Sequence, residues 1–253
     1  MDYRSSQLSI DNLSLAVNPL QLIYNRLKRF NSLSLADRLL LAETILITAA
    51  AVSAIKIFQI TASGAGWLVT PGILVTAALV PTIIKKGKFS EIGLSFRQIK
   101  HSLVVLGWTC FVVFPAMFCS LWLLKSYGLN LPLRPILPQN QELVSWLFYQ
   151  FMYVAVAEEV FFRGFLQSNI LRLMNTVVPE RHTMQCRVSI VISAACFAAA
   201  HIILQGRLIS VLTFLPGLIL GWLCIRTRSL LAPILFHGIA NISYYLIAGV
   251  LAG

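Results

Sequence analysis

The chain has 253 residues, of which 58% are hydrophobic and 11% are charged, and its mean hydropathy is +0.80. Ordinary soluble domains are about 25% charged, so this chain has too few charged and polar residues to cover the surface of a water-soluble fold. The composition therefore excludes a soluble protein and predicts one whose outer surface contacts lipid. The net charge of +11 does not indicate a nucleic-acid-binding protein, because the basic residues stand in short runs between apolar segments.

The segment 1–38 is polar and basic, and we predict that it forms a cytoplasmic N-terminal arm. Within the arm, the stretch 19–30 (PLQLIYNRLKRF) places apolar residues at helical spacing and basic residues around the rest of the helix. This pattern predicts an interfacial helix on anionic lipid, with a frayed basic tail as the alternative. Ser34 and Asp37 resemble a capping box at the start of the first apolar run. We expect no removable signal peptide, because the polar N-terminus is not followed by a short apolar stretch with a cleavage site.

Seven apolar runs approach the length of about 20 residues that a helix needs to cross a bilayer core. They cover residues 39–58, 65–84, 102–124, 143–165, 188–205, 208–225 and 230–251. The sequence thus predicts an all-α polytopic membrane protein with about seven transmembrane helices. We divide these helices between an N-terminal transmembrane region, 39–142, and a C-terminal one, 143–253.

The distribution of basic residues gives the orientation, because cytoplasmic loops carry the excess of Lys and Arg. Of the 20 Lys and Arg residues, 16 fall in the N-terminal arm or in the regions that end on the same side, and 4 fall on the other side. The chain is therefore predicted to be an integral, multi-pass protein of the cell membrane. Its N-terminus is expected in the cytoplasm and its C-terminus outside.

Three charged residues, Glu158, Glu159 and Arg163, stand inside the otherwise apolar fourth run, where charge is costly and marks function by default. On a helix, Glu159 and Arg163 are four residues apart, so their side chains meet on one face. Glu158 is rotated by about 100° from Glu159 and can face another helix. We predict that Arg163 neutralises Glu159 and leaves Glu158 unpaired, as a general acid or base requires. A buried ion pair that only fixes helix packing is the alternative.

Two later apolar runs also carry polar pairs at helical spacing. Phe197 and His201 lie four residues apart in the fifth run, and His237 and Asn241 lie four apart in the seventh. A lone His in a membrane helix can serve only as an interhelical hydrogen bonder. Together with the carboxylates, these groups stand on three helices that otherwise hold almost no ionisable residues. We therefore predict a water-filled polar site among the fourth, fifth and seventh spans.

The residue types in this site favour hydrolysis of an amide bond. A Glu with a His beside it can orient and deprotonate water, while a second His and an Asn amide can donate hydrogen bonds to a developing oxyanion. The sequence contains no HExxH motif of a zincin and no GxSxG elbow. Ser193 and Ser210 stand near His201 in the sequence, but no base is evident for either, so a serine mechanism is disfavoured.

Three short segments carry these residues in a fixed order. They are EEVFFRG at 158–164, FAAAH at 197–201 and HGIAN at 237–241. The segments resemble the EExxxR, FxxxH and HxxxN motifs of the CPBP family of intramembrane proteases, named for CAAX proteases and bacteriocin-processing enzymes and also called the ABI family. The segment 214–237 is similar to the family's linker between the last two motifs. The resemblance covers about residues 140–245 and marks 143–253 as a CPBP-like catalytic region.

The resemblance implies a role for each matching residue. The implied catalytic residues are Glu158, Glu159, Arg163, His201, His237 and Asn241, with Phe197 in a supporting place. Glu158 is expected to activate water with help from His201, and Glu159 is expected to pair with Arg163. The His and the Asn of the HxxxN segment are expected to form the oxyanion site.

The resemblance leaves metal dependence open. The family was described as metalloproteases, yet a metal-free glutamate mechanism is also proposed for its CAAX-processing members. Glu158, His201 and His237 are zinc-type donors, but a carboxylate and neutral imidazoles equally suit a metal-free base and oxyanion donor. We favour the metal-free alternative, so no cofactor is firmly predicted and zinc stays possible. The expected partners are the lipid bilayer and a membrane-anchored or lipidated substrate, such as a prenylated CAAX protein or a leader peptide, with no nucleic acid.

Two other functions are consistent with the sequence. The first is a non-proteolytic scaffold or bacteriocin-immunity protein on the same fold, against which the intact motif set argues. The second is a transporter or proton relay that uses the same buried groups. A transporter requires a polar path through the membrane, whereas these motifs lie on three helices. We therefore predict an intramembrane endopeptidase.

Overall fold

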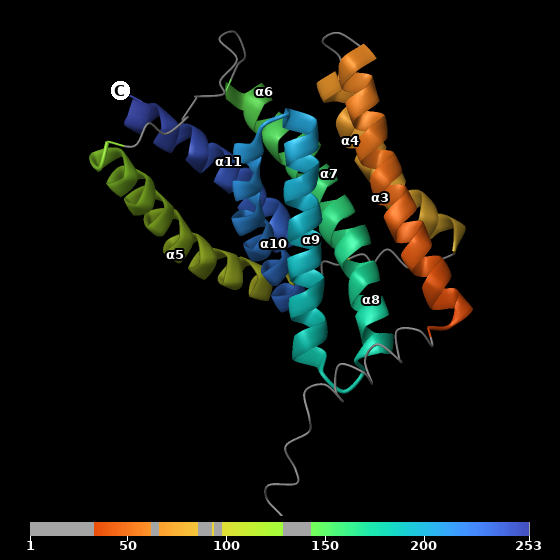
Figure 1. The fold of residues 1–253 in the computed structure, drawn as a ribbon. Helices are drawn as coiled ribbons and strands as arrows, with labels where there is room; N and C mark the ends of the chain where they lie inside the picture. Colours follow the sequence, from red (N-terminus) through yellow and green to blue (C-terminus); the bar gives the residue numbers. More distant parts are fainter. Residues whose placement is uncertain (1–32, 62–65, 86–92, 94–97, 129–142, 253) are drawn as a thin grey trace, which may run out of the picture.

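The structure is a computed structural model that describes residues 33–61, 66–85, 93, 98–128 and 143–252. These residues form helices and turns, and no strand occurs among them (Figure 1). The first helices are α3 (Leu35–Thr61), α4 (Gly66–Ile84) and α5 (Ile99–Ser126). A long helical segment then joins α6 (Leu143–Phe148), η2 (Tyr149–Ala155), α7 (Val156–Glu159), η3 (Val160–Gln167) and α8 (Ser168–Val177). The last elements are α9 (His182–Gln205), η4 (Leu208–Thr213), α10 (Phe214–Thr227) and α11 (Leu231–Ala252).

Five of the helical segments are long and apolar enough to cross a membrane. They are Leu35–Thr61, Ile99–Ser126, His182–Gln205, Leu208–Thr227 and Leu231–Ala248, while Val69–Ile84 is a shorter apolar helix. The prediction of an all-α integral membrane protein is confirmed. The number of seven spans and their orientation stay predictions. The helix predicted at 143–165 continues to Val177, because its last part packs Ile170 and Leu173 into the protein interior.

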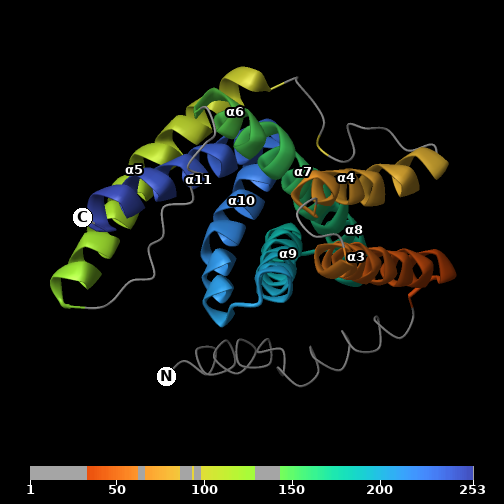
Figure 2. The same cartoon turned by 90° about the horizontal axis from the view of Figure 1, so that it is seen from above.

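The long helical segment lies between two pairs of helices (Figures 1 and 2). The hairpin of α3 and α4 packs on one side of it, and the pair of α5 and α11 lies on the other. The helices α9 and α10 pack against each other and against η3. Every helix that carries a predicted site residue therefore borders the middle of the bundle.

Two apolar clusters hold this arrangement together. In the first, Phe161 and Phe162 of η3 meet edge to face, with ring centroids 5.1 Å apart, and pack with Ile55 of α3 and Leu74 of α4. This cluster attaches the hairpin of α3 and α4 to the segment that carries the carboxylates. Rings of this size dominate the energy of a core because they bury a large apolar area.

The second cluster joins α5, α10 and α11. The ring of Phe114 stacks on that of Phe236, with centroids 5.5 Å apart. Leu106, Leu220 and Leu223 are buried beside them. This cluster fixes α11 one residue before His237, and so fixes the helix face that carries the HxxxN segment.

The outer faces of the helices are apolar, as the composition predicts. On α5, Trp108 is 67% exposed and Phe111 is 71% exposed. An apolar surface on this scale is unusual for a soluble protein and normal for one whose outer solvent is lipid. We expect apolar side chains exposed on these helices to contact the bilayer.

Ser34 and Asp37 cap the N-terminal end of α3, as the sequence predicts. The backbone N–H of Asp37 donates to Ser34 Oγ over 3.1 Å, and that hydroxyl donates to the Asp37 carboxylate over 2.7 Å. This is the N-terminal half of a capping box, and it begins α3 at Leu35. Further along, an ion pair joins Glu43 to Lys85 at the end of α4. The interfacial helix predicted at 19–30 lies outside the described residues.

Candidate active site

The carboxylates stand where the long helical segment changes its winding. The turns η2 and η3 are π-helical, and the four residues of α7 between them are α-helical. A π-helical turn is wider than an α-helical turn and is frequently found at functional sites. Here the sequence VAEE lies between two such turns, so the local geometry is set on both sides of Glu158 and Glu159.

Glu159 and Arg163 form the buried ion pair that their spacing predicts. Arg163 Nη1 donates to Glu159 Oε1 over 2.9 Å, and both side chains are 0% exposed. The guanidinium also donates from Nη2 to the Gly217 carbonyl over 3.2 Å and lies 4.5 Å from the ring centroid of Phe197. Burial of a charge is tolerated when it is paired and hydrogen-bonded in this way. Phe197 therefore supports the site by covering the guanidinium.

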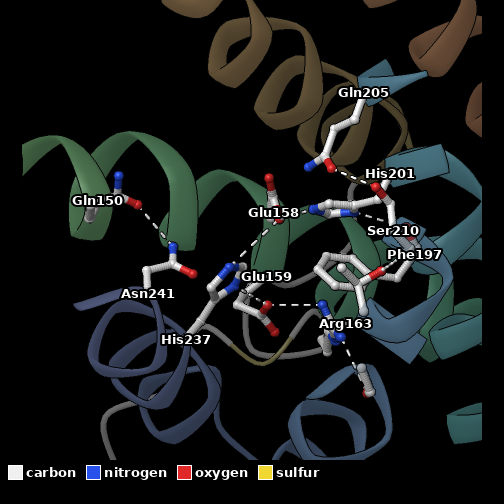
Figure 3. A network of polar contacts seen from close by, with 12 residues as sticks. Gln150, Glu158, Glu159, Arg163, Phe197, His201, Gln205, Ser210, His237 and Asn241 are labelled. Atoms are coloured by element: carbon white, nitrogen blue, oxygen red, sulfur yellow. Dashed lines mark hydrogen bonds and ion pairs between the residues drawn. The ribbon is translucent and has the colours of Figure 1, made fainter. Parts of the chain in front are cut away.

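Glu158 occupies a different environment from its neighbour (Figure 3). Its side chain is 17% exposed, and its Oε2 lies 3.9 Å from His201 Nε2 and 3.8 Å from His237 Nε2. The same oxygen is buried and makes no hydrogen bond within the described parts of the chain. One carboxylate is thus paired and fully buried, and the other faces two imidazoles and is accessible. The structure brings together Glu158, His201 and His237 from three helices.

The orientation of both imidazoles follows from their Nδ1 atoms. His201 Nδ1 lies 3.0 Å from the carbonyl oxygen of Phe197, one turn earlier in α9. His237 Nδ1 lies 2.8 Å from Glu159 Oε1. Both partners accept hydrogen bonds, so each Nδ1 carries a hydrogen; Nε2 is then a bare acceptor in a neutral ring and a donor in a protonated one. The two Nε2 atoms face Glu158.

The sequence predicts that His237 and Asn241 act together as an oxyanion site, and the structure adds a contact for each. The Nδ1 of His237 binds Glu159, so Nε2 can donate a hydrogen bond only when the ring is protonated. Asn241 Nδ2 donates to Gln150 Oε1 over 2.9 Å (Figure 3). Gln150 was not among the residues that the sequence singled out.

Arg163 and the next polar residue on its face, Gln167, bind α10 to the long helical segment. Arg163 Nη2 donates to the Gly217 carbonyl, and Gln167 Nε2 donates to the Gly221 carbonyl over 3.0 Å. The two donors are four residues apart, and so are the two acceptors. Two hydrogen bonds, about one helical turn apart, therefore join the helices. A Cβ on Gly221 would lie 2.9 Å from Gln167 Oε1. Gln167 follows Arg163 by four residues, and this spacing could have predicted from the sequence that both side chains share one helix face.

A cavity of about 490 Å³ opens next to Glu158 and His201. Its wall comes from α3, α4, α9 and the part of the long helical segment from η2 to η3, and combines apolar side chains with amides and hydroxyls. The polar lining residues are Gln59, Thr70, Tyr149, Tyr153, Glu158, His201 and Gln205. The first two belong to helices in which the sequence shows no motif. The hairpin of α3 and α4 therefore forms one side of the space that reaches the accessible carboxylate.

A close helix contact next to His237 leads to a first prediction. A Cβ on Gly238 would lie 2.7 Å from Phe151 Cζ and closer still to two other atoms of that ring. Gly238→Ala must therefore displace the Phe151 ring or push α11 away from η2, and we expect it to lower the free energy of unfolding by about 1–3 kcal/mol. Gly107→Ala in α5 is the matched control, because nothing lies within 4 Å of its Cβ position. Thermal unfolding in detergent measures both, and equal melting temperatures for the two variants would contradict the contact.

Glu158, His201 and His237 are residue types that can bind a metal ion. A carboxylate and two imidazole Nε2 atoms have the chemistry of zinc ligands. In the part of the chain that the structure describes, however, no group of three or more His, Cys, Asp or Glu side chains is arranged to hold a metal ion. The donor types fit zinc and their arrangement does not, so metal dependence is left to experiment.

Part of the chain matches a known protein family. Residues 140–243 match the family model described as type II CAAX prenyl endopeptidase Rce1-like. The match confirms the resemblance to the CPBP family over the region that carries all three motifs, and it supports a membrane protease of the CAAX type in general. No curated protein and no solved structure matches the chain.

Proposed function

We propose that this protein is an intramembrane endopeptidase that hydrolyses a peptide bond of a membrane-associated substrate, with Glu158 activating the attacking water. The observation that carries the proposal is the contrast between the two carboxylates. Glu159 is fully buried and paired with Arg163, while Glu158 is accessible from a cavity and faces two imidazole Nε2 atoms. A general base must reach both water and substrate, and only Glu158 meets that requirement.

The reaction can be followed proton by proton. A water molecule beside Glu158 gives one proton to the carboxylate, and the bare Nε2 of His201 orients it by accepting its other hydrogen. The oxygen forms a bond to the carbonyl carbon of the scissile peptide, and the Asn241 amide stabilises the oxyanion that develops. Glu158 then transfers its proton to the leaving nitrogen as the C–N bond breaks. The products are a new carboxyl group and a new amine, and Glu158 returns to its initial state.

The charges of the cluster support a protonated His237 as the second oxyanion donor. Arg163 and Glu159 cancel each other, which leaves the negative charge of Glu158 within a largely apolar environment. One additional proton makes the cluster neutral, and a neutral cluster costs less in a low dielectric. A proton on His237 Nε2 faces the carboxylate of Glu158 at 3.8 Å, while Nδ1 stays bound to Glu159.

The substrate is proposed to be anchored to the membrane, either as a prenylated CAAX protein or as a leader peptide. The cavity that reaches Glu158 supports this, because apolar side chains such as Leu74 and Phe162 line it together with amides and hydroxyls. Such a wall suits a peptide backbone that carries an apolar group. The bilayer supplies the second binding partner by concentrating an anchored substrate near the cavity.

We further propose a cytoplasmic N-terminus and seven spans, from the division of basic residues. Reporter fusions at Gln98 and at Gly253 are then expected to lie on opposite sides of the membrane, because five spans separate the two positions. A reporter that is active only in the cytoplasm measures this directly. Activity of both fusions on the same side would contradict the proposed topology.

Chelation tests the metal-free part of the mechanism. With water activated by Glu158 alone, purified protein is expected to hold less than stoichiometric zinc and to cleave a membrane-anchored reporter at the same rate after treatment with a chelator. A catalytic zinc would instead lower the pKa of its bound water to about 7 and supply the nucleophile. One tightly held zinc per chain, with activity lost on its removal and regained on its return, would overturn the metal-free mechanism and leave the protease assignment standing.

A further inference from the structure

We propose that Gln150 is a positioning residue of the active site, which holds the Asn241 amide so that it donates to the oxyanion. This inference rests on the proposed protease function and deepens it. Asn241 Nδ2 donates to Gln150 Oε1 over 2.9 Å, and both side chains are partly buried. The amide nitrogen of Asn241 carries two hydrogens, so one remains for the substrate once Gln150 has accepted the other.

The π-helical turn η2 places Gln150 on the same face as Glu158. Gln150 and Glu158 are eight positions apart. In a regular α-helix, eight positions rotate the chain by about 800°, so Glu158 would point about 80° away from the direction of Gln150. From Gln150 to Ala155 the chain follows the wider π-helical turn, at roughly 80° per residue, and the total advance becomes about 700°, close to two full turns. Gln150 therefore lies two turns before Glu158 and points towards the same neighbouring helix.

That neighbouring helix is α11, which runs antiparallel to this part of the chain. His237 contacts the Glu158 and Glu159 end, and Asn241 contacts Gln150 nearer the start of η2. The next contact along the two helices is between the aromatic rings of Trp146 and Tyr245, whose centroids are 5.4 Å apart. Contacts on both sides therefore fix the register of Gln150 against Asn241.

The close approach of the two helices makes the contact rigid. Gly238 of α11 is buried against the ring of Phe151, the residue after Gln150. With no Cβ at Gly238, the backbone of α11 comes close enough for the short Asn241 side chain to reach Gln150. The acceptor then restricts rotation of the Asn241 amide, so its second N–H is held in one direction before the substrate binds. Such preorganisation lowers the barrier because no reorientation is needed as charge develops.

The test compares two replacements of Gln150 in the full-length protein, with a membrane-anchored peptide reporter in liposomes. Gln150→Met keeps the length of the side chain and removes the acceptor, whereas Gln150→Glu keeps an acceptor oxygen for Asn241. We expect Gln150→Met to lower kcat by about tenfold or more with KM nearly unchanged, because the lost interaction stabilises the transition state. Gln150→Glu is expected to recover most of that loss.

A double-mutant cycle separates positioning from a general effect on folding. Asn241→Ala alone is expected to lower kcat by about 100-fold to 1000-fold, as does removal of one oxyanion donor. If Gln150 acts through Asn241, then Gln150→Met adds less than about a twofold change in the Asn241→Ala background. Full additivity, or an unchanged kcat in Gln150→Met alone, would overturn the inference. Absence of cleavage by the folded wild-type protein would instead overturn the proposed function itself.

Discussion

Glu158→Gln is expected to abolish reporter cleavage while leaving the protein as stable as the wild type. The side chain is partly exposed, its Oε2 makes no hydrogen bond within the described residues, and His237 can lose its added proton once Glu158 is replaced, so an amide there leaves no charge unpaired. Loss of a general base lowers a rate by about 100-fold to 10,000-fold. We therefore expect at least that loss in kcat, together with a change in the free energy of unfolding below about 1 kcal/mol.

Glu159→Gln is the matched control for that variant, because it makes the same chemical change one residue along the chain. Here the substitution leaves the Arg163 guanidinium buried without a counter-charge, so the free energy of unfolding is expected to fall by about 3–5 kcal/mol. Reporter cleavage and thermal unfolding in detergent, measured on both variants, give the comparison. Equal loss of stability in the two variants would contradict the division of roles between the carboxylates.

Arg163→Ala is expected to destabilise the protein as strongly as Glu159→Gln. It removes the donor to both Glu159 and the Gly217 carbonyl and leaves the buried Glu159 carboxylate with only the contact to His237 Nδ1. The expected loss is again about 3–5 kcal/mol, a large part of the stability of a typical domain. Arg172→Ala is the control, because Arg172 is an exposed arginine on the continuation of the same helical segment and its removal is expected to cost less than about 1 kcal/mol.

A double substitution shows whether the loss comes from the unpaired charge. Arg163→Met together with Glu159→Gln removes both charges and keeps the approximate volumes, so stability is expected to recover in part relative to Arg163→Met alone. Activity is not expected to recover, because His237 Nδ1 no longer faces a carboxylate. Unfolding of the double variant at the same temperature as Arg163→Met alone would show that the unpaired charge does not cause the effect.

Much of the fold and part of the site could be predicted from the sequence because lipid simplifies the pattern. Charged residues inside apolar runs are rare enough to mark the long helical segment, and the four-residue spacing of Glu159 and Arg163 is sufficient to predict their ion pair. That contact is confirmed at 2.9 Å. The same rule also places His201 beside Phe197, where the structure finds ring centroids 4.3 Å apart.

The remaining features depend on information that helical spacing does not contain. Gln150 could not be assigned to the face of Glu158, because an α-helical period rotates it away and only the π-helical turn restores it. The contribution of Gln59 and Thr70 to the cavity depends on which helices become neighbours. The contact between His237 and Glu159 arises in the same way, from packing of α11 against the long helical segment. Periodicity predicts which residues share a face but not which face they meet.

The central claim, that the chain hydrolyses a peptide bond with water activated in the membrane, is tested most directly in liposomes that contain only the purified protein and a membrane-anchored peptide reporter. The reaction is run in water enriched in oxygen-18, and the products are analysed by mass spectrometry. The wild-type protein is predicted to cut the reporter at one peptide bond and to place one heavy oxygen in the new carboxyl terminus. An intact reporter, in liposomes whose protein still unfolds cooperatively on heating, would contradict the account and favour a non-proteolytic scaffold on the same fold.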